Sequence, residues 1–181
     1  MYLKIAPVLV AMLITSLPGT AGAVSIDNAS LEVGTGARVR MVRLGVQSDF
    51  ERRWFVGNGR HLSGYWDASL AQWRGSAYQN IKGQHQNITN IGLKPVFRYQ
   101  RDDGMGWYAE GGIGANVLSE RYDNDDNRLS TLFQFSDHLG AGYVFQNQWE
   151  VAMKIEHFSN GGIKSPNSGA NFLMLKLARP F

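Results

Sequence analysis

The sequence of 181 residues predicts an all-β protein, an eight-stranded antiparallel up-and-down transmembrane β-barrel. Three observations support this fold class. Apolar and polar residues alternate with period two in eight successive stretches, which is typical of strands with one face against an apolar medium. Most stretches run for about ten residues or more, which suits a membrane-crossing strand better than a short globular strand. The polar face is rich in charge, as expected for side chains packed inside a narrow barrel.

The first 23 residues are expected to be a secretory signal peptide and not part of the barrel. A short basic start with Lys4 precedes an apolar run from Ile5 to Leu17, and Ala21-Gly22-Ala23 supplies the small residues of a cleavage site. The run is shorter than the roughly 20 apolar residues of a transmembrane helix. The barrel domain is therefore predicted to span residues 24–181.

The eight stretches can be placed in chain order by the apolar positions that would face lipid. These positions are Leu31 and Val33; Val42, Leu44 and Val46; Leu62, Trp66, Ala68 and Leu70; Ile91, Leu93, Pro95, Phe97 and Tyr99; Trp107, Ala109, Ile113 and Val117; Phe133, Phe135, Leu139, Ala141, Tyr143 and Phe145; Trp149, Val151, Met153 and Ile155; and Leu173, Leu175, Leu177 and Phe181. The alternate positions, which would point into the barrel, include Glu32, Arg43, Asp67, Lys94, Arg98, Glu110, Lys154, Glu156 and Lys176.

Aromatic residues and the chain terminus indicate a bacterial outer-membrane protein. Trp73, Trp107 and Trp149 lie near the ends of stretches, where an aromatic girdle would lie. Phe181 ends the last stretch in the way that is typical of outer-membrane barrels. These features favour a membrane barrel over a soluble lipocalin-like carrier with the same alternation.

The connections fit a meander whose first residues lie in the periplasm. The longer polar segments, 75–87 and 119–130, then fall on the cell exterior, as barrels of this type prefer. The segment from Phe50 to Arg60 is predicted to be a fairly long periplasmic link.

Composition excludes several other functions. The absence of Cys excludes a disulfide scaffold, a thiolate zinc site and a cysteine nucleophile. The formal net charge of +3 is too small and scattered to indicate nucleic-acid binding. No His or carboxylate pair has convincing metal spacing, and residues 123–126 are predicted to form a solvated loop and not a calcium site. The sequence therefore predicts no metal site.

Polar residues interrupt the lipid-facing pattern at one place. His157 and Ser159 follow Ile155 on the apolar face of the seventh stretch, and Asp137 follows Phe135 on that of the sixth. His and Ser two residues apart share one face of a strand, about 6.6 Å apart at Cα. Such a pair can supply the nucleophile and base of an acyl hydrolase. The same residues could instead anchor a lipid headgroup, because a bare His-x-Ser also arises by chance.

The chain resembles the PagL family of outer-membrane lipid A 3-O-deacylases. The similar motifs are Phe135-Ser136-Asp137 with Gly140-Ala141-Gly142; His157-Phe158-Ser159-Asn160 with Gly162, Lys164, Pro166 and Asn167; Leu62-Ser63-Gly64-Tyr65-Trp66-Asp67-Ala68; and Pro95-Val96-Phe97. The resemblance is densest between Phe135 and Asn167. It implies an eight-stranded barrel that hydrolyses the 3-position acyl ester of lipid A and releases a 3-hydroxy fatty acid. It implies no metal or cofactor.

The resemblance also implies roles for individual residues. Ser159 would be the nucleophile of a serine esterase and His157 its general base. Donors to the oxyanion would come from the turn after Ser159, which holds the supporting residues Asn160, Gly162 and Asn167. Phe135 and Asp137 match family positions close to this site. The expected partners are lipid A or lipopolysaccharide and the surrounding outer-membrane lipids, with a homodimer left open.

One position departs from the family pattern. The acidic third member of the family's site, a Glu, falls on Asn171 in an ungapped alignment from His157. An Asn oxygen can accept a hydrogen bond from the His Nδ1–H, but it offers no negative charge to the imidazolium. Asp137 is the alternative acid if it approaches His157 across the strands. A non-catalytic lipopolysaccharide-binding or structural outer-membrane barrel is therefore the alternative function.

Overall fold

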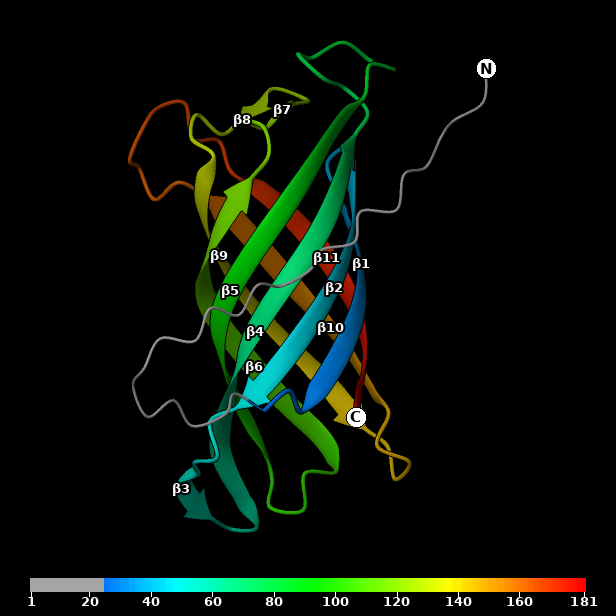
Figure 1. Cartoon of the computed structure of the whole chain (residues 1–181), viewed down its shortest axis with the longest axis vertical. Helices are drawn as coiled ribbons and strands as arrows, with labels where there is room; N and C mark the ends of the chain where they lie inside the picture. The colour runs from blue at the N-terminus through cyan, green and yellow to red at the C-terminus, as the bar shows by residue number, and fades with distance from the viewer. Residues whose placement is uncertain (1–24) are drawn as a thin grey trace.

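The computed structural model describes residues 25–181, which form a closed eight-stranded antiparallel barrel (Figure 1). The barrel strands are β1 (Asn28–Gly36), β2 (Val39–Asp49), β4 (Arg60–Gly75), β5 (Gln86–Arg101), β6 (Gly106–Leu118), β9 (Phe133–Val144), β10 (Glu150–Ser159) and β11 (Ala170–Pro180). Each strand pairs with its neighbours in the meander, and β1 pairs with β11 to close the barrel. The predicted fold class is thus confirmed. The predicted signal peptide lies outside the described residues.

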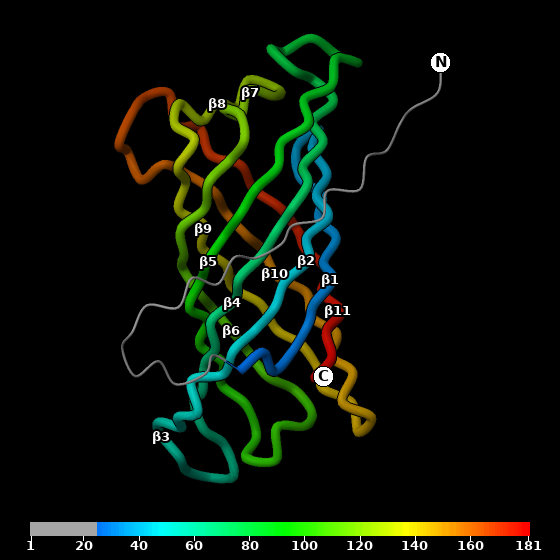
Figure 2. Tube along the Cα trace, viewed as in Figure 1, coloured from blue at the N-terminus to red at the C-terminus, as the bar shows by residue number. Residues whose placement is uncertain are grey.

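The two ends of the barrel differ in their connections (Figure 2). At the long-loop end lie the segments 76–85, 119–132 and 160–169. At the opposite end lie the connections 50–59, 102–105 and 145–149 and the C-terminus (Figure 1). The tight turn 37–38 between β1 and β2 lies at the long-loop end. No helix long and apolar enough to span a membrane occurs in residues 25–181.

Two small hairpins extend beyond the barrel wall. The predicted link from Phe50 to Arg60 contains β3 (Trp54–Gly57), which pairs with the start of β4. Its turn residues Asn58 and Gly59 have φ values of 52° and 71°, as a two-residue type I′ turn requires. In the predicted solvated loop, β7 (Asp123–Asn124) and β8 (Asn127–Arg128) form a similar hairpin. Both segments are therefore more ordered than the sequence pattern indicated.

The inner face of the barrel holds an ionic network, as predicted. All nine charged side chains expected to point inward are buried. Glu156 accepts hydrogen bonds from Arg43 at 2.9 Å and from Lys94 at 2.5 Å. Arg98 pairs with Glu110 at 2.7 Å and with Glu150 at 2.8 Å. Eight of the nine buried charges thus have ion-pair partners of opposite charge, which offsets the cost of removing them from water. Asp67 forms no ion pair within residues 25–181, and its Oδ1 accepts no hydrogen bond there.

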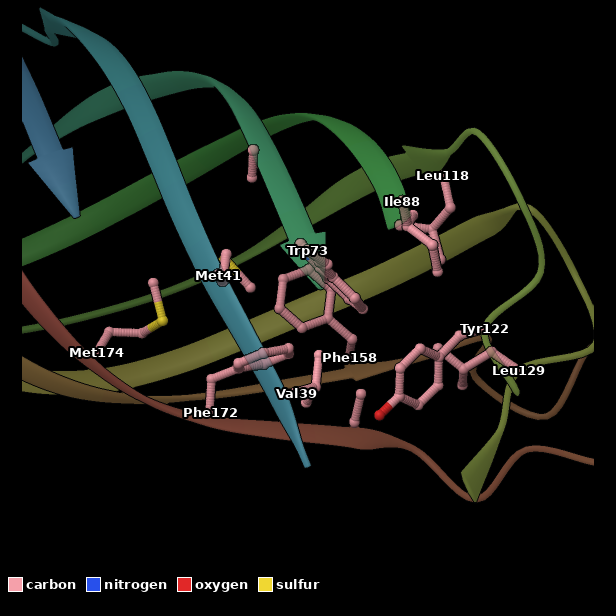
Figure 3. Close-up of a cluster of buried hydrophobic side chains, with 12 residues drawn as sticks. Val39, Met41, Trp73, Ile88, Leu118, Tyr122, Leu129, Phe158, Phe172 and Met174 are labelled. Atoms are coloured by element: carbon pink, nitrogen blue, oxygen red, sulfur yellow. The ribbon is translucent and has the colours of Figure 1, made fainter. Parts of the chain in front are cut away.

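Towards the long-loop end, the interior changes from ionic to apolar. Trp73, Phe158 and Phe172 pack edge to face there, with ring centroids 4.7–5.8 Å apart (Figure 3). Trp73 is fully buried, so its predicted place in an outer aromatic girdle is wrong. Its position is odd-numbered whereas the outward residues of β4 are even-numbered, and the pleat therefore turns it inward. This apolar plug supports the strand ends that carry the polar interruption.

Candidate active site

Three polar side chains lie in one row across neighbouring strands. In the antiparallel register, His157 of β10 pairs with Asp137 of β9 on one side and with Asn171 of β11 on the other. Directly opposed residues have Cβ atoms about 5 Å apart, so the three side chains are immediate neighbours. They face outward from the barrel, close to its long-loop end. The strand pairing thus brings together the predicted base and both candidates for its orienting partner.

The imidazole of His157 is oriented by Asn171. The His157 Nδ1–H donates a hydrogen bond to the Asn171 Oδ1 at 2.6 Å. An amide oxygen is only an acceptor, so this bond requires the tautomer with its proton on Nδ1. The lone pair of Nε2 is then left to accept a proton. No hydrogen bond between His157 and Asp137 occurs in residues 25–181, so Asp137 is near the base without orienting it.

Ser159 is the last residue of β10 and shares the outer face with His157. Its cross-strand partner is Phe135 of β9, and its own side chain is half-buried. The strand spacing of about 6.6 Å brings the Ser159 Oγ within reach of the His157 Nε2 if both side chains turn towards each other. Among the described residues the Ser159 Oγ forms no hydrogen bond. In enzymes without substrate, such catalytic contacts are often long and tighten only in the complex.

The turn after Ser159 is held by Asn160, whose side chain is completely buried. The backbone N–H of Asn160 donates to the Asn167 Oδ1 at 2.9 Å, and its Nδ2 donates to the Lys164 carbonyl at 2.6 Å. The Gly162 N–H donates to the Asn160 Oδ1 at 3.0 Å. The N–H groups of Asn160 and Gly162, both expected to serve the oxyanion, are therefore engaged in holding the turn.

Two other donors of the same turn are free. Neither the Gly161 N–H nor the Asn167 Nδ2 has an acceptor among residues 25–181. Gly161 has a φ of 64°. It lies beside the ring of Phe135, because a Cβ added at Gly161 would be 3.0 Å from the Phe135 Cδ2 and Cε2. Phe135 thus packs beside the turn, as its predicted supporting role requires. Sequence reasoning missed Gly161, because its N–H is distinguished from the others only by the hydrogen bonds that the folded turn forms.

Gly169 is a second residue that sequence reasoning missed. It follows the loop from β10 and precedes β11, with a φ of 80°. A Cβ at this position would lie 2.6 Å from the His157 Cε1. The loop therefore approaches the imidazole so closely that only glycine leaves space for the ring.

A groove runs along the outer wall beside this row. It has a volume of about 380 Å³ and its lining includes Asp137, Leu139, Ile155, His157, Asn171 and Leu173. Its floor is apolar, and the polar side chains lie along one edge. Such a groove suits an acyl chain whose polar end lies against His157. Residues 25–181 hold no group of three or more His, Asp or Glu side chains that could bind a metal ion.

Known proteins resemble this chain over most of its length. A family model described as lipid A 3-O-deacylase (PagL) matches residues 40–180. The chain is 32% identical over 167 residues to the lipid A deacylase PagL of Pseudomonas aeruginosa, which covers 92% of both chains. It is 38% identical over 87 residues to the lipid A deacylase PagL of Bordetella bronchiseptica, which covers 48% of this chain and 47% of that one.

A solved structure has the same architecture. The crystal structure of the outer membrane enzyme PagL matches with a TM-score of 0.73 and 29% sequence identity, and the match covers 85% of this chain and 99% of that chain.

Proposed function

The chain belongs to the PagL family, and from this premise we propose that it is an outer-membrane serine esterase that removes the 3-position acyl chain of lipid A. The observation that carries the proposal is the row of Asp137, His157 and Asn171, with Ser159 on the same face two residues from the base. A nucleophile, a base and an orienting group are the parts that acyl transfer to serine needs.

In the proposed first step, the Ser159 Oγ attacks the carbonyl carbon of the acyl ester. The Nε2 of His157 takes the hydroxyl proton, because the bond from Nδ1 to Asn171 leaves Nε2 as the basic nitrogen. The carbonyl oxygen becomes negatively charged in the tetrahedral intermediate. The Gly161 N–H and the Asn167 Nδ2, which lack other acceptors in the described chain, are the donors proposed to stabilise it.

The first half of the reaction ends when the tetrahedral intermediate collapses and the bond between the acyl carbonyl carbon and the sugar 3-oxygen breaks. His157 returns its proton to the departing 3-hydroxyl group of lipid A, and the acyl chain stays on the Ser159 Oγ. A water molecule, deprotonated by His157, then attacks the acyl-enzyme. When this second tetrahedral intermediate collapses, the bond between the acyl carbon and the Ser159 Oγ breaks, and His157 returns the proton taken from water to the Oγ. A 3-hydroxy fatty acid is released and the Ser159 hydroxyl and neutral His157 are restored.

Protonated His157 needs a nearby negative charge, which Asn171 cannot give. Asp137 lies on the other side of the ring, one strand spacing away, in a groove of low polarity where charges interact more strongly than in water. We assign two separate roles on this basis: Asn171 orients the imidazole, and Asp137 supplies the charge. The family's Glu would combine both roles in one side chain.

The location of the groove suits a lipid substrate. It opens on the outer wall, where the apolar side chains Leu139, Ile155 and Leu173 are exposed. Because the long-loop end is expected to face the cell exterior, the site would lie at the level of lipid A headgroups in the outer leaflet. An acyl chain could then enter the groove from the membrane without leaving the lipid phase.

The proposal is tested by mass spectrometry of lipid A after incubation with the detergent-purified protein. The wild-type chain should remove one 3-hydroxyacyl group, and Ser159→Ala should remove none while keeping the folded barrel. Ser168→Ala is the matched control, because Ser168 is an exposed serine in the adjoining loop, and it should keep full activity. Unchanged lipid A with folded wild-type protein would instead support the non-catalytic lipopolysaccharide-binding barrel, for which the neutral Asn171 is the favouring observation.

A further inference from the structure

Two arginine side chains face each other on the outer wall at the long-loop end. Arg40, the second residue of β2, is the cross-strand partner of Arg74, the next-to-last residue of β4. Both are exposed, and neither forms an ion pair within residues 25–181. Like charges in directly opposed positions destabilise a strand pair. This pair is therefore expected to have an anion as its partner.

The two arginines line a groove of about 430 Å³, together with Thr35, Ser76 and His85. No carboxylate lines this groove. A third lining arginine, Arg38, is already neutralised, since its Nε lies 2.8 Å from the Asp125 Oδ1. The groove thus offers two unmatched guanidinium groups. Guanidinium groups bind phosphate with paired hydrogen bonds, and an anionic group of this kind fits between them.

The arginine pair is connected to the active-site groove through a single row of cross-strand partners. Leu139, Ile155 and Leu173 line the active-site groove, and the row continues from Leu173 to Thr35, then to Arg40 and Arg74. All six side chains are on the outer face. Figure 1 shows the strands β11, β1, β2 and β4 side by side along this path.

The length of this row matches a large headgroup. Arg40 lies three strands from Ile155 and Arg74 lies four strands from it, which is roughly 14 and 19 Å along the wall at the usual strand spacing. The row of His157 lies two residues further along the strands, towards the loops. A ligand that occupies both places must therefore extend over several strands, as a phosphorylated disaccharide can and a single fatty acid headgroup cannot.

We propose that Arg40 and Arg74 form a phosphate-binding site that holds the phosphorylated headgroup of the lipid substrate while the ester lies at Ser159. This inference rests on the proposed function and specifies how the substrate is recognised. The arginines do not touch the reacting atoms, so they act as binding residues. Their contribution should appear mainly in KM, and it should depend on the phosphate groups of the substrate.

The test compares kcat/KM for phosphorylated lipid A with kcat/KM for the same lipid A after enzymatic dephosphorylation. The wild type should prefer the phosphorylated substrate by about tenfold, the effect of one charge-assisted contact at an exposed site. The double variant Arg40→Gln/Arg74→Gln should lose this preference, and the loss should appear in KM and not in kcat. The double change to Lys should keep part of it, because the charge stays but the paired hydrogen bonds do not.

The matched control removes two charges from the opposite end of the barrel. Arg52 and Arg53 are exposed in the segment before β3, far from both grooves. Arg52→Gln with Arg53→Gln should keep the wild-type preference. Equal cleavage of both substrates by the wild type would overturn the phosphate site and leave the deacylase function standing. Loss of the preference in the control pair would also overturn it, since a general charge effect would then explain the result.

A binding measurement keeps the inference testable if no substrate is cleaved. The Ser159→Ala protein in detergent should bind phosphorylated lipid A with a Kd about tenfold lower than that for dephosphorylated lipid A. Adding Arg40→Gln and Arg74→Gln to this protein should abolish the difference. Competition by phosphatidylglycerol or by inorganic phosphate separates the sources of the anion. Weak competition by both supports a site for the substrate headgroup, whereas competition by phosphatidylglycerol equal to that by lipid A would contradict it.

Discussion

Gly169 and His157 lie in direct contact, although they belong to different elements. The Cα of Gly169 faces the imidazole so closely that an added methyl group would be 2.6 Å from the His157 Cε1. The edge of the ring is therefore fixed by the loop, and its Nδ1 is fixed by Asn171. These two contacts determine the direction in which Nε2 points.

Gly169→Ala is expected to displace the imidazole and to lower kcat by about 100-fold, the scale of loss for a misplacement of about 1 Å. The matched control is Gly83→Ala, because Gly83 also has a positive φ (87°) but has open space around it. Both variants carry the same kind of backbone strain. Steady-state rates on lipid A check the prediction, and equal losses in the two variants would show that strain, not the ring, is responsible.

Asn171→Glu is expected to raise kcat by about tenfold, because a carboxylate both accepts the His157 Nδ1–H and stabilises the imidazolium. Replacement of the acid in serine proteases lowers kcat by about 10⁴, which sets the upper limit for the gain. Asn171→Gln is the matched control, since Gln has the shape of Glu without its charge. The measurement compares kcat on the same lipid A for the wild type, Asn171→Glu and Asn171→Gln. If Asn171→Glu is no faster than Asn171→Gln, a missing negative charge does not limit kcat.

Asp137→Asn is expected to lower kcat by about tenfold in the wild-type background, since it removes the charge beside His157. The loss should be much smaller when Asn171→Glu is already present, because a second carboxylate then serves the imidazolium. The double-mutant cycle measures this coupling directly. Additive effects of the two changes would mean that Asp137 does not act through the base.

Trp73→Ala is expected to destabilise the barrel by about 3–5 kcal/mol, because it leaves a large cavity in the apolar plug. Phe158 precedes Ser159 and Phe172 follows Asn171, and both rings pack on Trp73, so activity should fall as well. Trp107→Ala is the control, as Trp107 is exposed on the outer wall. Urea unfolding followed by circular dichroism compares the two, and equal midpoints would contradict the structural role of the plug.

Much of the fold follows from period-two alternation, because a pleated strand places successive residues on opposite faces. The inward charges, including Glu156 and Lys94, could be identified in this way. The odd-numbered position of Trp73 in β4 indicates an inward side chain, so its aromatic character alone is not enough to place it in the outer girdle. The β3 hairpin was missed although Asn58-Gly59 is a strong turn signal, since its short strand shows too few alternating residues to be recognised.

The site could be predicted only in part. His157, Ser159 and Asp137 stand out because they place polar groups on a lipid-facing surface, which is costly unless they have a function. Asn171 carries no such signal and was located through the family alignment. Gly161, Gly169 and the internal bonds of Asn160 depend on the path of the loop in space. The cross-strand pairing of Arg40 with Arg74 depends on the strand register, which the alternation pattern alone does not determine.

The most direct test of the Ser159–His157 pair is covalent labelling with a fluorophosphonate, followed by peptide mass spectrometry. We predict one adduct, on Ser159, formed more than about 100-fold faster in the wild type than in His157→Gln, in line with the loss of a general base. His61→Gln, which changes a histidine at the opposite end of the barrel, should label at the wild-type rate. An adduct on another serine, or equal labelling rates with and without His157, would contradict the roles of Ser159 as nucleophile and His157 as base.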